Sequence, residues 1–367
     1  MWKVTKIALL GFVTVIFVLV VAGLSYRAYR QRQNANASAI RTPNCIDEAM
    51  FIPIGGVEQW VSIRGQERTN PVLLVLDGGP GAAGSAFVPS KLEKDFVVVE
   101  WDQPGAGKTF GRAGRRIDPN LTIEQVVRDG NEVAEYLRQH LHANKIALLG
   151  ISWGTIIGLN MIKLRPDLFF AYVGTGQVVN MQRGEALNYA HVLAKARARG
   201  DRAAISDLEK ILPPPYVSDA AFRTQRTLAL AYETEAPSGS ALFLGVLFAP
   251  RYGLRDVANW MRGFFASQDH FIGSAMNGPM MAVDLPALGT HFDVPVFVFQ
   301  GTEDDFTPFE LAEAYIASIN APEKLFVAAP GAGHFAFETR WQDMLQFLVA
   351  RVRPLAIEAA AGDNISS

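Results

Sequence analysis

A serine lies between two glycines in the run Gly150-Ile-Ser152-Trp-Gly154, which separates an apolar stretch from a helical pattern. In a sharp turn from a strand to a helix, side chains two residues away on either side of the serine would clash, and glycine avoids that clash. Such a turn raises the Ser152 hydroxyl above the sheet, and the first N–H groups of the following helix face negative charge that develops there. The spacing therefore predicts Ser152 as a nucleophile in acyl transfer.

A serine hydroxyl attacks poorly unless a neighbouring base removes its proton. His334 lies in a glycine-rich loop after the last predicted strand, which places it at the same edge of the sheet as Ser152. We therefore expect His334 to be the base. The other five of the six histidines lie on an amphipathic helix, in a predicted helical insertion or directly before a strand: His140, His142, His191, His270 and His291.

The group that orients such a histidine should follow the preceding strand, and three carboxylates do: Glu303, Asp304 and Asp305. All three could instead belong to a polar turn that caps the next helix, so residue type alone leaves the choice open. The order of serine, carboxylate and histidine along the chain is the one found in hydrolases built on an α/β sheet.

Glycines also follow the third predicted strand, in the run Asp77-Gly-Gly-Pro-Gly81. A loop without side chains can turn a backbone N–H toward the oxyanion of a tetrahedral intermediate. A second N–H would come from Trp153, the residue after the serine. This loop is therefore the predicted wall of an oxyanion hole.

A later run, Gly107-Lys108-Thr109, is similar to the end of a phosphate-binding loop. That motif needs a glycine five residues before Gly107, and Asp102 stands there instead. We therefore expect no nucleotide at this loop.

Five motifs, taken together and in this order, resemble the proline iminopeptidase branch of the α/β hydrolases (serine peptidase family S33). They are Asp77-Gly-Gly-Pro-Gly81, Asp102-Gln-Pro-Gly-Ala-Gly-Lys-Thr109, Gly150-Ile-Ser-Trp-Gly154, Gly301-Thr-Glu-Asp304 and Gly333-His334. The resemblance covers residues 48–352 and implies an α/β-hydrolase fold with a cap that closes over the pocket. It also implies Ser152 as nucleophile, Asp304 as acid, His334 as base, and the N–H groups of Gly79 and Trp153 as oxyanion donors.

The sequence departs from that family's pattern at Asp77, where the family has histidine, and at Pro104 and Thr109, where it has arginine and serine. A carboxylate that pointed into an oxyanion hole would oppose the transition state, so we expect Asp77 to bind nearby backbone instead. The departure bears on the substrate more than on catalytic competence.

Family members that remove N-terminal proline hold the free amine with glutamates of the cap. Glu185, Glu233 and Glu235 are the candidates here, although a solvated helix charge is the commoner role for a glutamate at each of these positions. Glu185 comes soonest after the sixth predicted strand, where the chain leaves the sheet above Ser152. We therefore expect Glu185 to bind substrate.

Eight short β-rich runs, bounded by turn residues, must position these groups. Continuous apolar runs such as 72–76 are typical of strands buried on both faces of a parallel sheet. Only a short turn at Gly55-Gly56 separates the first two runs, which predicts a hairpin, and helical patterns lie between the later ones. The pattern indicates a mixed, mostly parallel α/β fold. The predicted strands are Ala49–Ile54, Gln59–Arg64, Val72–Leu76, Phe96–Trp101, Lys145–Leu149, Tyr172–Gly176, Val294–Gln300 and Lys324–Ala328.

The alternation of strands and helices stops between about residues 180 and 290, where helical patterns recur without a convincing strand. We interpret residues 181–290 as a helical cap. The cap would be inserted into a core formed by residues 46–180 and 291–356.

Eighteen residues without a charge lie near the start of the chain, at Ile7–Leu24. At about 1.5 Å per residue they nearly cross a hydrocarbon core of about 30 Å, and the tyrosines and arginines after them suit a membrane interface. A signal peptide is the alternative. Its apolar region is usually shorter, however, and the small-x-small pattern Ala37-Ser-Ala39 lies far downstream. We expect a single-pass transmembrane anchor at 1–25, followed by a polar linker at 26–45. The side of the membrane on which the rest of the chain lies stays open.

Composition excludes several classes of protein. A chain of 49% hydrophobic and 19% charged residues is not disordered, and a net charge of −2 argues against a nucleic-acid partner. The single cysteine, Cys45, excludes intrachain disulfides and a cysteine-based zinc site, and we expect no metal or cofactor.

Together the patterns predict a membrane-tethered serine hydrolase, an aminopeptidase for short peptides with a free N-terminus. The alternatives are an esterase or other acyl hydrolase for a small metabolite, and an inactive anchored binding protein.

Overall fold

The computed structural model describes residues 2–87 and 91–363 of the chain. Its core is one eight-stranded sheet with the strand order β1-β2-β4-β3-β5-β6-β7-β8. Strand β2 runs antiparallel to both of its neighbours, and every other neighbouring pair is parallel. The mostly parallel eight-stranded sheet predicted from the sequence is therefore confirmed. Its strands are β1 (Ile46–Ile54), β2 (Val57–Gly65), β3 (Val72–Leu76), β4 (Val97–Asp102), β5 (Ile146–Ile151), β6 (Phe169–Thr175), β7 (Val296–Gly301) and β8 (Lys324–Ala329).

Helices cover both faces of the sheet because its central strands are buried on both sides. All five residues of β3 are buried. Leu74 belongs to the apolar cluster that also contains side chains of α3, α4 and α10, whereas Leu73 belongs to a second cluster with α12. This alternation follows from the two-residue repeat of a strand. The helices of the core are α2 (Gly107–Arg112), α3 (Ile123–Leu141), α4 (Trp153–Leu164), α10 (Phe309–Ser318), α11 (Ala336–Thr339), α12 (Trp341–Phe347) and α13 (Arg353–Asp363).

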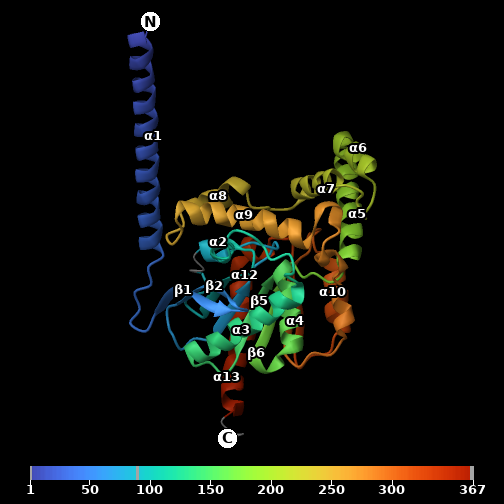
Figure 1. Cartoon of the computed structure of the whole chain (residues 1–367). Coiled ribbons are helices and arrows are strands. Elements are labelled where there is room, and N and C mark those ends of the chain that lie inside the picture. The colour runs from blue at the N-terminus through green and yellow to red at the C-terminus, as the bar shows by residue number, and fades with distance from the viewer. Residues whose placement is uncertain (1, 88–90, 364–367) are drawn as a thin grey trace.

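Five α-helices lie between β6 and β7, and Figure 1 shows them gathered over one end of the core. Three of them, α5, α6 and α7, share an apolar cluster of their own that includes Val192, Leu208 and Tyr232. The helix α9 packs closely on the core: a Cβ placed on Gly263 would lie 2.7 Å from the carbonyl oxygen of Gly105. These helices are α5 (Met181–Arg199), α6 (Arg202–Ile211), α7 (Asp219–Tyr232), α8 (Gly239–Leu247) and α9 (Leu254–Phe271).

The N-terminal helix α1 (Trp2–Ala37) is long and apolar enough to cross a membrane, and its most apolar window is not buried in the structure. Figure 1 shows it standing beside the body and extending past the five inserted helices. A polar linker was predicted for residues 26–45. The first part of this segment is helical instead, because α1 continues through Ala37. Polar side chains of that part donate to backbone carbonyls at the end of α8 and directly after it.

Candidate active site

Ser152 occupies the turn between β5 and α4, as the sequence predicted. Its backbone is strained, with φ 51° and ψ −114°, and its side chain is half-buried. A Cβ on Gly154 would lie 1.8 Å from the carbonyl oxygen of Leu76, and one on Gly150 would lie 2.8 Å from the carbonyl oxygen of Gly154. Only glycine fits at either position, so the two glycines are what permits this turn.

The loop after β3 lies directly against Ser152. A Cβ on Gly78 would be 3.3 Å from Cβ of Ser152, and the next residue, Gly79, has a φ of +111° that favours glycine. On the other side of Ser152, Trp153 is the first residue of α4, and N–H groups in the first turn of a helix have no partner within the helix. The structure therefore brings the backbone of Gly79 and Trp153 to the neighbourhood of the serine.

Gln103 joins the two sides of this region, and the sequence interpretation gave it no role. The indole Nε1 of Trp153 donates to Oε1 of Gln103 at 2.9 Å, and Nε2 of Gln103 donates to the carbonyl oxygen of Asp77 at 3.3 Å. Gln103 is buried, and it belongs to the Asp102-Gln-Pro motif after β4. It fixes the loop after β3 relative to the helix that begins beside Ser152.

Of the three carboxylates after β7, Asp304 is the one that contacts His334. Both of its carboxylate oxygens lie 3.1 Å from Nδ1 of His334. Gln300 Nε2 and the backbone N–H and hydroxyl of Thr307 also donate to Asp304, at 2.7 to 2.9 Å, which fixes the carboxylate. Asp304 is buried and therefore depends on these partners.

The other two carboxylates have partners elsewhere. Glu303 accepts a hydrogen bond from the hydroxyl of Thr234 at 2.7 Å. Asp305 forms ion pairs with Lys195 and with His191, both on α5. The contacts of Asp305 hold α5 to the core, and Asp304 is the carboxylate that contacts His334.

His334 and Ser152 meet the same short stretch at the end of β6. The N–H of Ser152 donates to the carbonyl oxygen of Thr175 at 2.9 Å. A Cβ on the next residue, Gly176, would lie 2.8 Å from Cε1 of His334. Burial would lower the pKa of His334, but the charge and hydrogen bond of Asp304, together with the charge of Glu233, raise that pKa above its usual value.

Glu233, directly after α7, accepts a hydrogen bond from the backbone N–H of His334. Its second oxygen, Oε2, is buried without a hydrogen-bond partner among the described residues. Burial raises the pKa of Glu233 to about 7, although the hydrogen bond from His334 works against that rise. Glu233 thus places a buried carboxylate oxygen, without a partner in the part of the chain that the structure describes, beside the candidate base.

Glu185, the predicted substrate-binding residue, is buried on α5 and forms an ion pair with Arg226 of α7. It lines a small cavity together with Phe306 and Thr307. The ring of Phe306 lies 5.3 Å from that of His334, so the cavity is close to the candidate base. The third candidate, Glu235, is exposed and pairs with Arg340 at 2.7 Å.

Asp77 does not point at the oxyanion region. Its Oδ2 accepts a hydrogen bond from the N–H of Gly84 at 2.6 Å, as expected for a carboxylate that binds nearby backbone. It lies instead beside Glu100 and Asp102, two further buried carboxylates. Burial raises the pKa of Asp77 to about 6 and that of Asp102 to about 7, and it raises the pKa of Glu100 well above its usual value.

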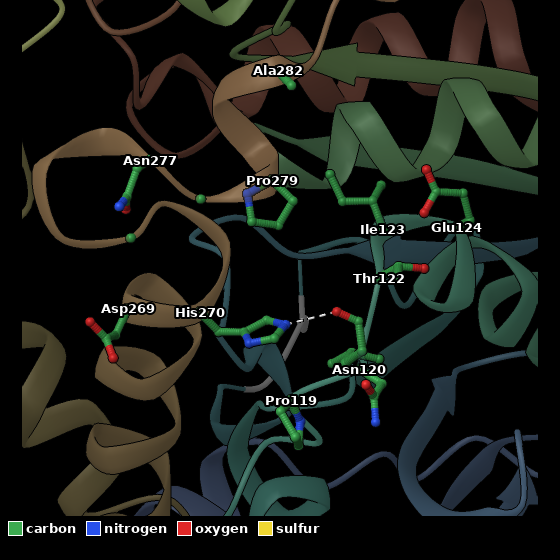
Figure 2. Close-up of a pocket in the computed structure, with 13 residues that line it drawn as sticks. Pro119, Asn120, Thr122, Ile123, Glu124, Asp269, His270, Asn277, Pro279 and Ala282 are labelled. Carbon is green, nitrogen blue, oxygen red and sulfur yellow. Dashed lines mark hydrogen bonds between the residues drawn. The ribbon is translucent and has the colours of Figure 1, made fainter.

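A pocket of about 680 Å³ lies away from these groups, between the segment before α3 and the end of α9. Figure 2 shows His270 reaching across it to the backbone, where its Nε2 lies 2.7 Å from the carbonyl oxygen of Leu121. Neither Ser152, Asp304 nor His334 lines it. This pocket is thus separate from the candidate active site.

A family model described as "alpha/beta hydrolase fold" matches residues 71–340. A Bacillus subtilis protein named "Probable aminopeptidase YbaC" is 29% identical over 292 residues, which cover 77% of this chain and 89% of that protein. A proline iminopeptidase of Lactobacillus delbrueckii subsp. lactis is 24% identical over 307 residues, 80% of this chain and 95% of its own.

Among solved structures, a proline iminopeptidase of Mycobacterium smegmatis superposes with a TM-score of 0.59 at 18% identity, covering 85% of this chain and 100% of its own. At that identity the superposition shows a shared fold. Together with the sequence relatives, it confirms the resemblance that the five motifs predicted.

Proposed function

Because this chain belongs to the α/β-hydrolase fold family, we propose that it is a serine hydrolase in which Ser152, His334 and Asp304 act as nucleophile, base and orienting acid. The contact between Asp304 and Nδ1 of His334, with both oxygens at 3.1 Å, is the observation that carries the proposal. It fixes the histidine tautomer that has its proton on Nδ1, and the free Nε2 can then accept the proton of a serine hydroxyl.

The reaction follows from that arrangement. Ser152 Oγ attacks an acyl carbon while His334 removes its proton, and the oxyanion of the tetrahedral intermediate accepts hydrogen bonds from the N–H groups of Gly79 and Trp153. His334, now charged and paired with Asp304, donates its proton to the leaving group. A water molecule, activated in the same way, then releases the acyl group from Ser152.

The proposed substrate is a short peptide with a free N-terminus. Two observations support this choice. The relatives are named probable aminopeptidase and proline iminopeptidase, and two cap carboxylates are candidates for the amine: Glu233 binds the backbone of His334, and Glu185 lines a cavity with Phe306 and Thr307. Burying an ammonium group without a partner is costly, so such a substrate needs a carboxylate in the pocket. Arg226 already neutralises Glu185, whereas Glu233 has an oxygen without a partner. The contacts therefore favour Glu233 as the amine partner, while the prediction for Glu185 remains to be tested.

An esterase is the second candidate, and the Glu185–Arg226 ion pair favours it. That pair cancels charge on the side of the cavity nearest Phe306. If Glu233 is protonated as well, which its pKa of about 7 allows near neutral pH, the pocket carries no net charge. An uncharged acyl ester would then bind as well as a peptide with a free amine.

A substrate panel separates the two. On proline or alanine arylamides, a charge-assisted hydrogen bond to the free amine is worth about 1.5–3 kcal/mol, so N-acetylation should lower kcat/KM about ten- to a hundredfold. The substitution Glu233→Gln should cause the same loss on free amines and spare simple esters, with Glu185→Gln tested beside it. Equal rates on free and acetylated substrates would reject the aminopeptidase and support the esterase.

We place this activity at a membrane, because α1 contains the uncharged run Ile7–Leu24 and its most apolar window is not buried. A single-pass anchor of about 27 Å nearly matches a hydrocarbon core of about 30 Å. Flotation of the full chain with lipid vesicles, resistant to high salt and to alkaline carbonate, is the measurement that tests the anchor. A chain that such washes release would not be anchored by this helix.

A further inference from the structure

The end of α1 binds the turn between α8 and α9 through side chains on one face of the helix. Arg27 donates to the carbonyl oxygens of Leu247 and Tyr252 at 3.0 and 2.6 Å. Gln31 donates to those of Ala249 and Tyr252 at 2.7 and 2.9 Å, and Asn34 to that of Phe248 at 3.0 Å. Residues four and seven positions after Arg27 lie on the same face of a helix, so the three side chains act together.

These contacts complete the C-terminal end of α8. The last carbonyl groups of a helix have no partner within it and carry partial negative charge, so a guanidinium group is favourable there. Arg27 supplies that group. The ring of Phe248 lies 5.8 Å from that of Tyr26 and 5.1 Å from the guanidinium of Arg30. We call this set of contacts, made by Tyr26, Arg27, Arg30, Gln31 and Asn34, the α1 clamp.

The α1 clamp sets the height of α8 relative to the apolar run. Leu24 ends that run, and Arg27 follows three residues later, about 4.5 Å along the helix axis. When Ile7–Leu24 spans a bilayer, the contacts of Arg27, Gln31 and Asn34 therefore place the turn between α8 and α9 about 5 to 15 Å beyond the end of that run, in and just outside the headgroup region. Figure 1 shows α8 and α9 on the side of the body toward which the N-terminus of α1 extends.

The outer face of α9 suits such a position. Its inner face contacts the core through Gly263 and through Ser267, whose hydroxyl donates to the carbonyl oxygen of Gly105 at 3.0 Å. On the opposite face, Met261 and Phe265 are 39% and 63% exposed. Arg262, between them, is also exposed and has no ion pair among the described residues.

Two further regions extend this face. Phe243 and Leu244 of α8 are 38% and 47% exposed. At the start of α9, Leu254 is 53% exposed beside the exposed Arg255. Large exposed apolar side chains interspersed with arginines are typical of helices that lie in the interface of an anionic membrane.

We propose that the outer face of α8 and α9 rests on the surface of the bilayer that α1 spans, held there by the α1 clamp, with Arg255 and Arg262 facing anionic headgroups. This inference rests on the proposed membrane anchor. The inner face of α9 binds the loop after β3, since Gln268 donates to the carbonyl oxygen of Pro80 at 2.9 Å and Trp260 to that of Ala83 at 3.1 Å. The candidate active site would therefore lie directly beneath a helix that touches lipid.

Depth-dependent quenching of single labels tests the proposal on the full chain in vesicles of phosphatidylcholine and phosphatidylglycerol that contain spin-labelled lipid. In a Cys45→Ser background, a fluorophore attached through Met261→Cys reports on the outer face of α9. The matched control is Gln139→Cys, exposed near the end of α3, at the edge of the sheet opposite the cap. We expect quenching several-fold greater at position 261 than at position 139.

The clamp is tested in the same vesicles. Arg27→Ala combined with Gln31→Ala should reduce quenching at position 261 at least twofold while the protein remains bound to the vesicles, and Arg32→Ala, on the exposed side of α1, should not. Equal quenching at positions 261 and 139 in vesicle-bound protein would overturn the membrane face and leave the anchor intact. Unchanged quenching in the double variant would overturn the role of the clamp. A chain that does not bind vesicles at all would overturn the anchor and the face together.

Discussion

The backbone N–H of His334 donates a hydrogen bond to the carboxylate of Glu233, so a residue of the cap touches the loop that carries the proposed base. The two residues are 101 positions apart in the sequence. Glu233 directly follows α7, and its position therefore depends on how the cap sits on the core. This contact couples the charge state of the cap carboxylate to the proton affinity of the histidine.

A first prediction concerns that coupling. The negative charge of Glu233 contributes to the raised pKa of His334, and a base must be neutral to act. Glu233→Gln, which keeps an acceptor for the N–H of His334, should therefore move the acid limb of kcat/KM to lower pH on an ester without an amine, because kcat/KM reports pKa values of the free enzyme. The measurement is a pH profile between about pH 5 and 9. Glu235→Gln, at an exposed ion pair, is the control, and an unmoved limb in Glu233→Gln would argue against the coupling.

The second prediction concerns the nucleophile. Ser152→Ala should leave the fold intact, because the strained turn depends on Gly150 and Gly154 rather than on the serine hydroxyl. It should lower kcat by roughly 10³-fold or more, as removal of a triad member does. Turnover near that of the native chain, at an unchanged melting temperature, would contradict the proposed mechanism.

A third prediction separates the carboxylates after β7. Asp304→Asn should lower kcat by about 10⁴-fold, because an amide favours the wrong tautomer of the histidine. Glu303→Gln, whose partner is Thr234, should cost far less. Asp305→Asn should mainly reduce stability, because Asp305 pairs with Lys195 and His191 rather than with His334. Turnover and thermal melting of the three variants decide the assignment, which fails if Asp305→Asn is the one that stops turnover.

The sheet was predictable because each central strand is a short apolar run that can be recognised in its own sequence. The run 72–76 matches β3 at both ends, since it is apolar on both faces and bounded by residues that leave the sheet. The edge strand β1 begins three residues earlier than predicted, at Ile46 instead of Ala49. The first residues of β1 are in the strand because they pair with the end of β2, where Ile46 lies opposite Gly65. Such pairing cannot be inferred from the sequence of one strand alone.

Contacts between distant segments were not predictable in the same way. The polar stretch after Leu24 reads as a linker because the backbone carbonyls that Arg27, Gln31 and Asn34 bind lie more than 200 positions away in the sequence. The same holds for Glu185, whose ion pair with Arg226 joins two helices of the cap. The sequence singled out Asp304 as the partner of His334 only through the family motif. Glu303, Asp304 and Asp305 all carry carboxylates, and only the directions of their side chains in the fold distinguish them.

The last prediction concerns the three buried carboxylates beside the loop after β3. Glu100 is 8% exposed, its Oε2 has no hydrogen-bond partner among the described residues, and burial together with the charges of Asp77 and Asp102 raises its pKa. A carboxyl group whose pKa is higher in the folded state than in the unfolded state stabilises the fold fully at acid pH. That contribution is lost as pH rises from the unfolded pKa of about 4.3 through the folded one, by at most about 1.4 kcal/mol per pH unit for one proton.

Glu100→Gln removes this loss because the amide is neutral at every pH. A Cβ on Gly84 would meet both Glu100 Oε2, at 2.4 Å, and Asp77 Oδ1, at 2.7 Å, so the new amide N–H lies close to a carboxylate that can accept its hydrogen bond. We expect the variant to melt at about the native temperature at pH 5 and at a higher temperature at pH 8. Glu313→Gln, exposed on α10, controls for the change in net charge and should leave the profile as it is. A Glu100→Gln chain that melts below the native one at pH 8 would show that the ionised carboxylate stabilises this cluster, because its charge would then be compensated by donors rather than opposed by burial.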